Sequence, residues 1–120
     1  GLRMSTKKQQ RRLTRYMVDA QIDVLNQMTG EVIGSVVDIH TEGLMLVGLV
    51  EVDCIYMVRL VPQEKAHRVG DIELGIDCLW SSSLEQGESC WAGCRIIDAS
   101  PEAVAKIECL LSDFGRPRPD

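Results

Sequence analysis

The sequence predicts a mainly β domain, a six-stranded antiparallel small β-barrel with one C-terminal amphipathic helix. Three observations lead there: short runs in which apolar and polar residues alternate, clusters of turn residues between these runs, and a single helical pattern at the end. Barrel closure would remove the exposed strand edges of such a sheet. With 120 residues and 45% hydrophobic content, the chain is long enough for one domain with a real core.

The first three predicted strands cover residues 16–24, 31–39 and 44–52. In the first, apolar residues alternate with polar ones, as in a strand with one wet face, and the MTG sequence at residues 28–30 then turns the chain. The third run is apolar at nearly every position. This pattern indicates a sheet that is closed or covered.

Three more strands are predicted at residues 55–61, 72–80 and 89–97. They are separated by the polar sequences PQEKAHRVGD and SSSLEQGE, which show no helical period. Short connections of this kind favour antiparallel neighbours, which completes the predicted barrel of six strands.

The period changes after Ser100, where an amphipathic helix is expected. Ser100 is a good N-cap, Pro101 suits the first helical position, and Glu102 complements the positive end of the helix. Gly115 is placed to end it. The helix would present its apolar side to the barrel through Val104, Ile107, Leu110, Leu111 and Phe114.

The chain then divides into three parts. Residues 1–15 are expected to be a mobile basic segment, residues 16–114 the barrel and helix, and residues 115–120 a disordered tail with nothing to bury. Residues 1–18 hold six basic residues and no acid, whereas the rest holds seven basic and eighteen acidic residues, a net charge of −11 within the total of −5. An acidic body disfavours a nucleic acid polymer and suits a compact anion, although a solvated basic tail is the alternative.

No apolar stretch approaches the roughly 20 residues of a membrane span, and the start GLRMSTKK lacks the apolar centre of a secretory signal, so we expect a cytoplasmic protein without membrane insertion. An odd number of cysteines then indicates reduced thiols. Cys90 and Cys94 would lie about 13 Å apart along a strand, too far for a shared zinc ion, and are expected to be core thiols. Trp80 and Trp91 are expected in the core or against the helix.

Two motifs flank the first two predicted strands. RRLTR, from Arg11 to Arg15, matches an RxxxR element, and DIHTEG, from Asp38 to Gly43, matches all but one defined position of a [D/N]xSxxG element. In this order, roughly twenty residues apart, the pair resembles the PilZ domain family. The predicted six strands, a late strand containing GCRI and the terminal helix extend this resemblance over nearly the whole chain.

The resemblance implies a bacterial receptor for the second messenger cyclic di-GMP, of the kind linked to motility and biofilm formation. The nucleotide would be a ligand, with no cofactor, no metal and no catalysis, because no nucleophile and base arrangement stands out. A protein partner in a motility, pilus or polysaccharide machine is implied, and no nucleic acid. The receptor would change shape or partner when it binds the nucleotide.

The chemistry of the matched residues suits this ligand. The guanidinium groups of Arg11 and Arg15, with Arg12 as a neighbour, can pair with phosphate or with guanine and can stack on a base. Asp38 can accept from the N1 and N2 donors of guanine. Gly43 would allow a left-handed turn or a close approach of the ligand. A simple polar hairpin end is the alternative reading of Asp38 and Gly43.

His40 departs from the family pattern, which has serine at this position. An imidazole is bulkier, and its donor and acceptor nitrogens are set by the tautomer. It could donate to a phosphate or stack on guanine. It could equally mark a divergent PilZ-like adaptor that does not bind nucleotide and acts by protein–protein interaction, and both possibilities remain open from the sequence.

Overall fold

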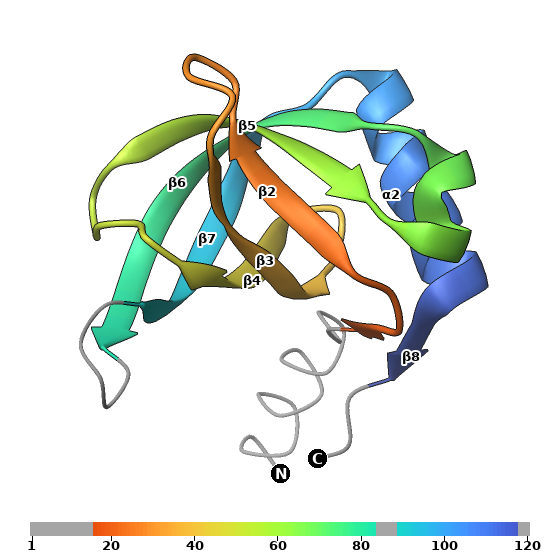
Figure 1. Cartoon of the computed structure of the whole chain (residues 1–120), viewed down its shortest axis with the longest axis horizontal. Coiled ribbons are helices and arrows are strands. Elements are labelled where there is room, and N and C mark those ends of the chain that lie inside the picture. Colours follow the sequence, from red (N-terminus) through yellow and green to blue (C-terminus); the bar gives the residue numbers. More distant parts are fainter. Residues whose placement is uncertain (1–15, 84–88, 118–120) are drawn as a thin grey trace, which may run out of the picture.

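The computed structural model describes residues 16–83 and 89–117, so the predicted mobile segment 1–15 and residues 118–120 lie outside it (Figure 1). No helix in the described part is long and apolar enough to cross a membrane. In chain order the elements are β1 Tyr16–Val18, β2 Ile22–Asn26, β3 Val32–Ile39, β4 Gly43–Gly48, β5 Ile55–Pro62, η1 Glu64–Val69, β6 Ile72–Ser83, β7 Cys90–Asp98, α2 Pro101–Phe114 and β8 Gly115–Pro117.

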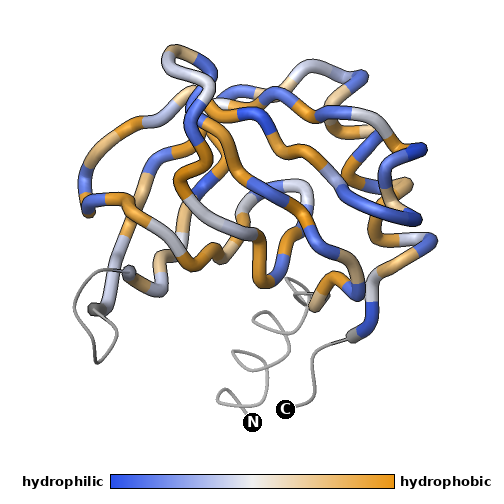
Figure 2. The backbone as a smooth tube through the Cα atoms, in the orientation of Figure 1, coloured by the Kyte–Doolittle hydropathy of each residue, from blue (hydrophilic) through white to orange (hydrophobic). Residues whose placement is uncertain are grey.

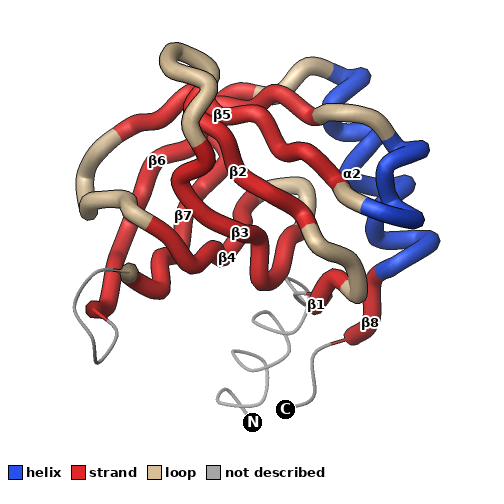
Figure 3. Tube along the Cα trace, viewed as in Figure 1, coloured by secondary structure: helices blue, strands red, loops and turns tan. Residues whose placement is uncertain are grey.

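Six of the strands form a closed antiparallel barrel. They follow one another in the order β2-β5-β6-β7-β4-β3, and a further pairing between β2 and β3 closes the ring. The short strands β1 and β8 continue from the edge of β3 as an extension of the barrel wall (Figures 1 and 3). The predicted six-stranded barrel with a C-terminal helix is therefore confirmed.

The barrel interior is filled by the apolar residues of the alternating runs. Figure 2 shows hydrophobic and hydrophilic positions alternating along several strands. At least one strand-borne residue of each barrel strand is buried inward, and most are β-branched residues or leucine, which fill a small barrel well. The inward residues that are almost completely inaccessible include Ile22, Val24, Ile39, Leu46, Val58, Leu60, Ile72, Leu74, Ile76 and Ala92.

The first predicted strand, residues 16–24, is split into β1 and β2 by a bend at Asp19 and Ala20. β2 pairs with the first half of β3, whereas β1 pairs with the end of β3. The backbone N–H of Asp19 donates to the carbonyl of Phe114 at 2.8 Å, which holds the bend against the end of α2. Alternation continues through the bend, so the sequence pattern alone predicted one strand where there are two.

The third strand is also shorter than predicted, because β4 ends at Gly48 instead of residue 52. Gly34 of β3 and Gly48 of β4 are register partners at a point where the two backbones approach closely, and a Cβ on Gly48 would overlap the carbonyl of Ile33. Beyond it the chain leaves the sheet and turns, with Asp53 in the left-handed region at φ 67°.

Of the four register irregularities in the described sheet, two determine which residues lie beside the β3–β4 turn on the outer face. In β3, Val36 pairs with Leu46 and Asp38 with Met45, so that Val37 is the extra residue. Val36 points into the barrel, and simple alternation would send Asp38 inward as well. The bulge instead aligns Asp38 with Met45, which lies on the outer face and does not belong to the core cluster.

The second bulge lies at Leu79 of β6. Before it Cys78 pairs with Cys94 inside the barrel, and after it Trp80 pairs with Gly93 on the outside. The prediction of core positions for the tryptophans is therefore wrong: Trp80 and Trp91 are 40% and 38% exposed on the outer face. The Trp80 indole covers Gly93, where a Cβ would overlap its Nε1 atom.

The C-terminal helix begins and ends as its sequence predicts. Ser100 Oγ accepts a hydrogen bond from the Ala103 N–H at 3.0 Å, Pro101 opens the helix and Phe114 closes it. The expectation of a disordered tail from Gly115 is wrong for residues 115–117, which form β8 and pair with β1. Pairing with β1 supplies hydrogen-bond partners for backbone N–H and C=O groups of residues 115–117.

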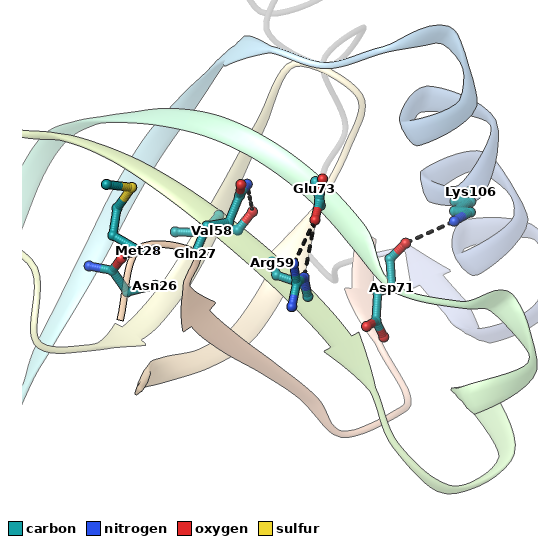
Figure 4. A network of polar contacts seen from close by, with 8 residues as sticks. All are labelled: Asn26, Gln27, Met28, Val58, Arg59, Asp71, Glu73 and Lys106. Atoms are coloured by element: carbon teal, nitrogen blue, oxygen red, sulfur yellow. Dashed lines mark hydrogen bonds and ion pairs between the residues drawn. The ribbon is translucent and has the colours of Figure 1, made fainter. Parts of the chain in front are cut away.

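The segment between β5 and β6 forms the 3₁₀ helix η1, which joins α2 at one side of the barrel. Arg68 forms an ion pair with Asp113 at 2.8 Å and lies 5.4 Å from the centre of the Phe114 ring. Lys106 of α2 donates to the carbonyl of Asp71 at 2.9 Å, as Figure 4 shows. These contacts fix the end of α2, and with it the start of β8.

The cysteines are free and differ in accessibility. Cys78 and Cys94 are register partners inside the barrel, and both are buried. Burial raises the pKa of both thiols, to about 12 for Cys94, where the neighbouring Cys78 adds to the effect. Cys90, expected to be a core thiol, is only half-buried at the start of β7, as are Cys54 and Cys109.

We therefore expect two classes of thiol in the native protein. Iodoacetamide should modify Cys54, Cys90 and Cys109, whereas Cys78 and Cys94 should react only after denaturation, because the thiolate is the nucleophile and burial disfavours it. Peptide mass spectrometry after timed alkylation at pH 8 measures this. Native-state modification of Cys94 as fast as that of Cys109 would contradict the buried pair.

Candidate functional site

The structure places three of the predicted site residues together, at the turn from β3 to β4. Asp38 is next to the last residue of β3, His40 begins the turn, and Gly43 is the first residue of β4. Arg11, Arg12 and Arg15 lie outside the described residues. The described part of the candidate site is therefore its barrel side.

β1 lies directly beside this turn. Tyr16 pairs with Ile39 and Met17 with Asp38 in antiparallel register. The residue that precedes Tyr16 in the chain is Arg15, the second arginine of the RxxxR motif. The first described residue after the RxxxR motif therefore lies on the strand next to the turn.

Asp38 is fully buried even though the bulge at Val37 turns it to the outer face. A carboxylate withdrawn from water is costly unless it accepts hydrogen bonds, and charged side chains are seldom buried without a reason. Among the described residues, Asp38 is the only polar or charged residue that is buried. This combination of burial and outward direction marks it as the centre of the candidate site.

His40 shapes the turn with both its backbone and its side chain. Its N–H donates to the carbonyl of Gly43 at 2.9 Å, and its Nδ1 accepts from the N–H of Glu42 at 3.1 Å. An accepting Nδ1 assigns the neutral ring's proton to Nε2. The Glu42 carbonyl in turn accepts from Ile96 at 2.9 Å, which holds the turn against β7.

The sequence offers two reasons for glycine at position 43, a left-handed turn or a close approach of the ligand, and the structure adds a third. The positive-φ glycines of the described chain are Gly30 and Gly70, so the left-handed turn predicted at Gly43 is wrong. A Cβ on Gly43 would instead lie 2.9 Å from the carbonyl oxygen of Cys94 and 3.4 Å from His40 Nε2. The close approach at this glycine is therefore made by β7 and by the imidazole.

A cross-strand row on the outer face passes through Asp38. Register partners in antiparallel strands point to the same side of the sheet, so the row can be followed from strand to strand. We call it the outer row. From β8 to β6 it consists of Arg116, Met17, Asp38, Met45, Gly93 and Trp80.

Sequence reasoning missed Arg116, Met17 and Trp80 as neighbours of the motif. Arg116 lay in a segment expected to be disordered, and Trp80 was assigned to the core. No local signal could have placed them, because the row depends on two bulges and on the pairing of both chain ends. Within residues 16–83 and 89–117, no group of three or more histidine, cysteine or acidic side chains could hold a metal ion.

No protein-family model and no curated protein sequence matches the chain. Among solved structures it is similar to the PilZ domain with c-di-GMP of YcgR from Escherichia coli, with a TM-score of 0.62 and 8% identity over 83% of this chain and 87% of that one.

Two longer proteins are also similar in structure. MrkH, a c-di-GMP-dependent transcription regulatory factor, matches with a TM-score of 0.58 and 16% identity over 82% of this chain. PlzA of Borreliella burgdorferi, in complex with c-di-GMP, matches with a TM-score of 0.52 and 12% identity over 92% of this chain. The chain spans 48% of MrkH and 55% of PlzA.

At these identities the likeness concerns the fold. The closed six-stranded barrel, the C-terminal helix and the three structural neighbours agree with the resemblance seen in the two sequence motifs. The chain has a PilZ-like fold.

Proposed function

We propose that the protein is a receptor for cyclic di-GMP, which binds between the basic N-terminal segment and the β3–β4 turn. The observation that carries the proposal is the register of β1 on β3, in which Tyr16 and Met17 lie opposite Ile39 and Asp38. Arg15 directly precedes Tyr16 in the chain, and consecutive Cα atoms are about 3.8 Å apart. The RxxxR motif therefore ends one residue before this pairing begins.

The chemistry of the site fits the two halves of the ligand. Arg11 and Arg15 supply planar guanidinium groups for phosphates and bases, and Arg12 adds positive charge beside them. Asp38 offers a buried carboxylate that would distinguish guanine from adenine through the N1 and N2 donors of guanine. His40 Nε2 and the turn that ends at Gly43 form the edge of the site.

The structural neighbours support this ligand class, because all three are described as binding or depending on c-di-GMP. A receptor needs only positioning groups, and we propose no catalytic activity. The free cysteines are in keeping with a reducing compartment, and we expect the protein to work in the bacterial cytoplasm.

We propose that the signal is an ordering transition. Without ligand, residues 1–15 would be mobile, and cyclic di-GMP would fix them to the barrel by bridging their arginines and Asp38. The new surface would then change the affinity for a partner in a motility, pilus or polysaccharide machine.

An adaptor that does not bind nucleotide is the second candidate, favoured by an exposed apolar surface on the outside of β5, β6 and β7. Ile55, Met57 and Ile97 are 63%, 40% and 44% exposed. Met57 and Ile97 both lie next to Gly75, where a Cβ would be 3.2 Å from the Met57 sulfur and 3.7 Å from Ile97. A surface of this kind suits a protein partner more than a nucleotide.

The arginines provide the direct test. Arg11→Ala and Arg15→Ala should each weaken cyclic di-GMP binding by about 2 kcal/mol or more, roughly 30-fold, because each removes charge-assisted hydrogen bonds. Arg12→Ala should cost less. Isothermal titration calorimetry measures the three dissociation constants beside the wild type.

The same titration separates the candidates when GTP and a single-stranded oligonucleotide are included. Selective binding of cyclic di-GMP supports the receptor, and binding to none of the three ligands favours the adaptor. Unchanged affinity in both Arg11→Ala and Arg15→Ala would remove these arginines from the site.

Amide hydrogen exchange tests the ordering transition. On addition of cyclic di-GMP, residues 9–18 and 37–43 should gain protection together, since one ligand bridges both segments. The amide protection of the barrel strand β6 should change little, and β6 serves as the reference. Protection limited to α2 would instead indicate a different binding surface.

His40 can be replaced by the family residue. In His40→Ser, the serine Oγ can accept from the Glu42 N–H in the same way as Nδ1 does now, so the turn should persist and affinity should stay equal or improve. His67→Ser, at the exposed histidine of η1, is the matched control. A loss of tenfold or more confined to His40→Ser would show that the imidazole itself contacts the ligand.

A further inference from the structure

The C-terminal strand β8 reaches the candidate site from the side opposite to the β3–β4 turn. Tyr16, Met17 and Val18 of β1 pair with Pro117, Arg116 and Gly115. β1 is therefore flanked by β3 on one edge and by β8 on the other, as Figure 3 shows. The hydrogen bond from the Asp19 N–H to the Phe114 carbonyl fixes where β8 begins.

This register puts Arg116 in the outer row, two strands from Asp38. Arg116 lies opposite Met17, and Met17 lies opposite Asp38. Two strand spacings of about 4.8 Å separate the Cα atoms of Arg116 and Asp38 by about 10 Å. Because directly opposed residues share a face, the Arg116 side chain leaves the sheet on the same side as the Asp38 carboxylate.

The charge of Arg116 is not neutralised by its described surroundings. Arg59, Arg68 and Arg95 each form an ion pair with a carboxylate, and Figure 4 shows the pair of Arg59 with Glu73 at 2.8 Å. Arg116 is exposed and forms no ion pair with any residue in the described ranges. In a body that is acidic as a whole, this leaves a guanidinium beside the candidate site for an external anion.

The distance of about 10 Å between the Cα atoms of Arg116 and Asp38 suits a ligand that carries both a guanine and a phosphate. A cyclic dinucleotide carries guanine edges and phosphates in one compact molecule, so a site that holds guanine at Asp38 has phosphate oxygens nearby. The three-methylene side chain of Arg116 is long enough to reach across Met17, which is apolar and 43% exposed. The planar fork of arginine can donate two parallel hydrogen bonds to phosphate oxygens.

We propose that Arg116 is a phosphate-binding residue of the cyclic di-GMP site, positioned by β8. This inference rests on the proposed function and adds a contact that the two motifs do not contain. The nucleotide then lies over the outer row, with Met17 between Arg116 and Asp38. The end of α2 becomes part of the binding site through β8.

Calorimetric titration of the full chain with cyclic di-GMP tests the assignment. Arg116→Gln should weaken binding about tenfold or more, as expected for the loss of charge-assisted hydrogen bonds, and Arg116→Lys should weaken it less because the charge remains. Lys65→Gln is the matched control, since Lys65 is an exposed cation of η1 without an ion pair to the described residues. Its affinity should stay within about twofold of the wild type.

The outcomes separate this inference from the proposed function. If the wild type binds and Arg116→Gln binds as tightly as Lys65→Gln, Arg116 is not a ligand contact, although the receptor stands. If the wild type does not bind, both proposals fail. The melting temperature of ligand-free Arg116→Gln should equal that of the wild type, and a clear decrease together with weak binding would assign Arg116 to strand packing and overturn the proposal.

Discussion

Closure of the barrel gives every strand one inward and one outward face, and a single extra residue in β3 decides which face Asp38 takes. Without the bulge at Val37, the carboxylate would follow Val36 into an apolar interior, where a charge is strongly disfavoured. With it, Asp38 lies on the outer face beside β1. Both the stability of the core and the existence of the candidate site depend on this local change of register.

The candidate site also depends on strand β1, which joins both ends of the described chain to the barrel. On one edge it pairs with the end of β3, and on the other with β8, while the bend after it is bonded to the last turn of α2. A ligand that orders the residues before Tyr16 would therefore act on a strand already coupled to the helix. Under the proposed ordering transition, this contiguous set of backbone pairings would connect the ligand site to α2.

The β3–β4 turn owes its shape to the backbone as much as to side chains. The bond from His40 N–H to Gly43 and the bond from Ile96 N–H to Glu42 keep the turn in place. Gly43 is required there by the approach of the Cys94 carbonyl, so packing by itself accounts for a glycine at this position. These backbone bonds do not depend on the side chain at position 40, where the PilZ sequence motif has serine.

The sequence by itself determined the fold class, the extent of α2 and the two motifs, because periodicity and helix caps are local properties that residues express through their neighbours in the chain. Only the tertiary structure decided the bend at Asp19, the bulges at Val37 and Leu79, and the pairing of β8. Each of these depends on register between distant strands, which no local pattern encodes. For that reason Trp80 and Arg116 were assigned to a core and a tail, and long-range pairing brings both into one row with Asp38.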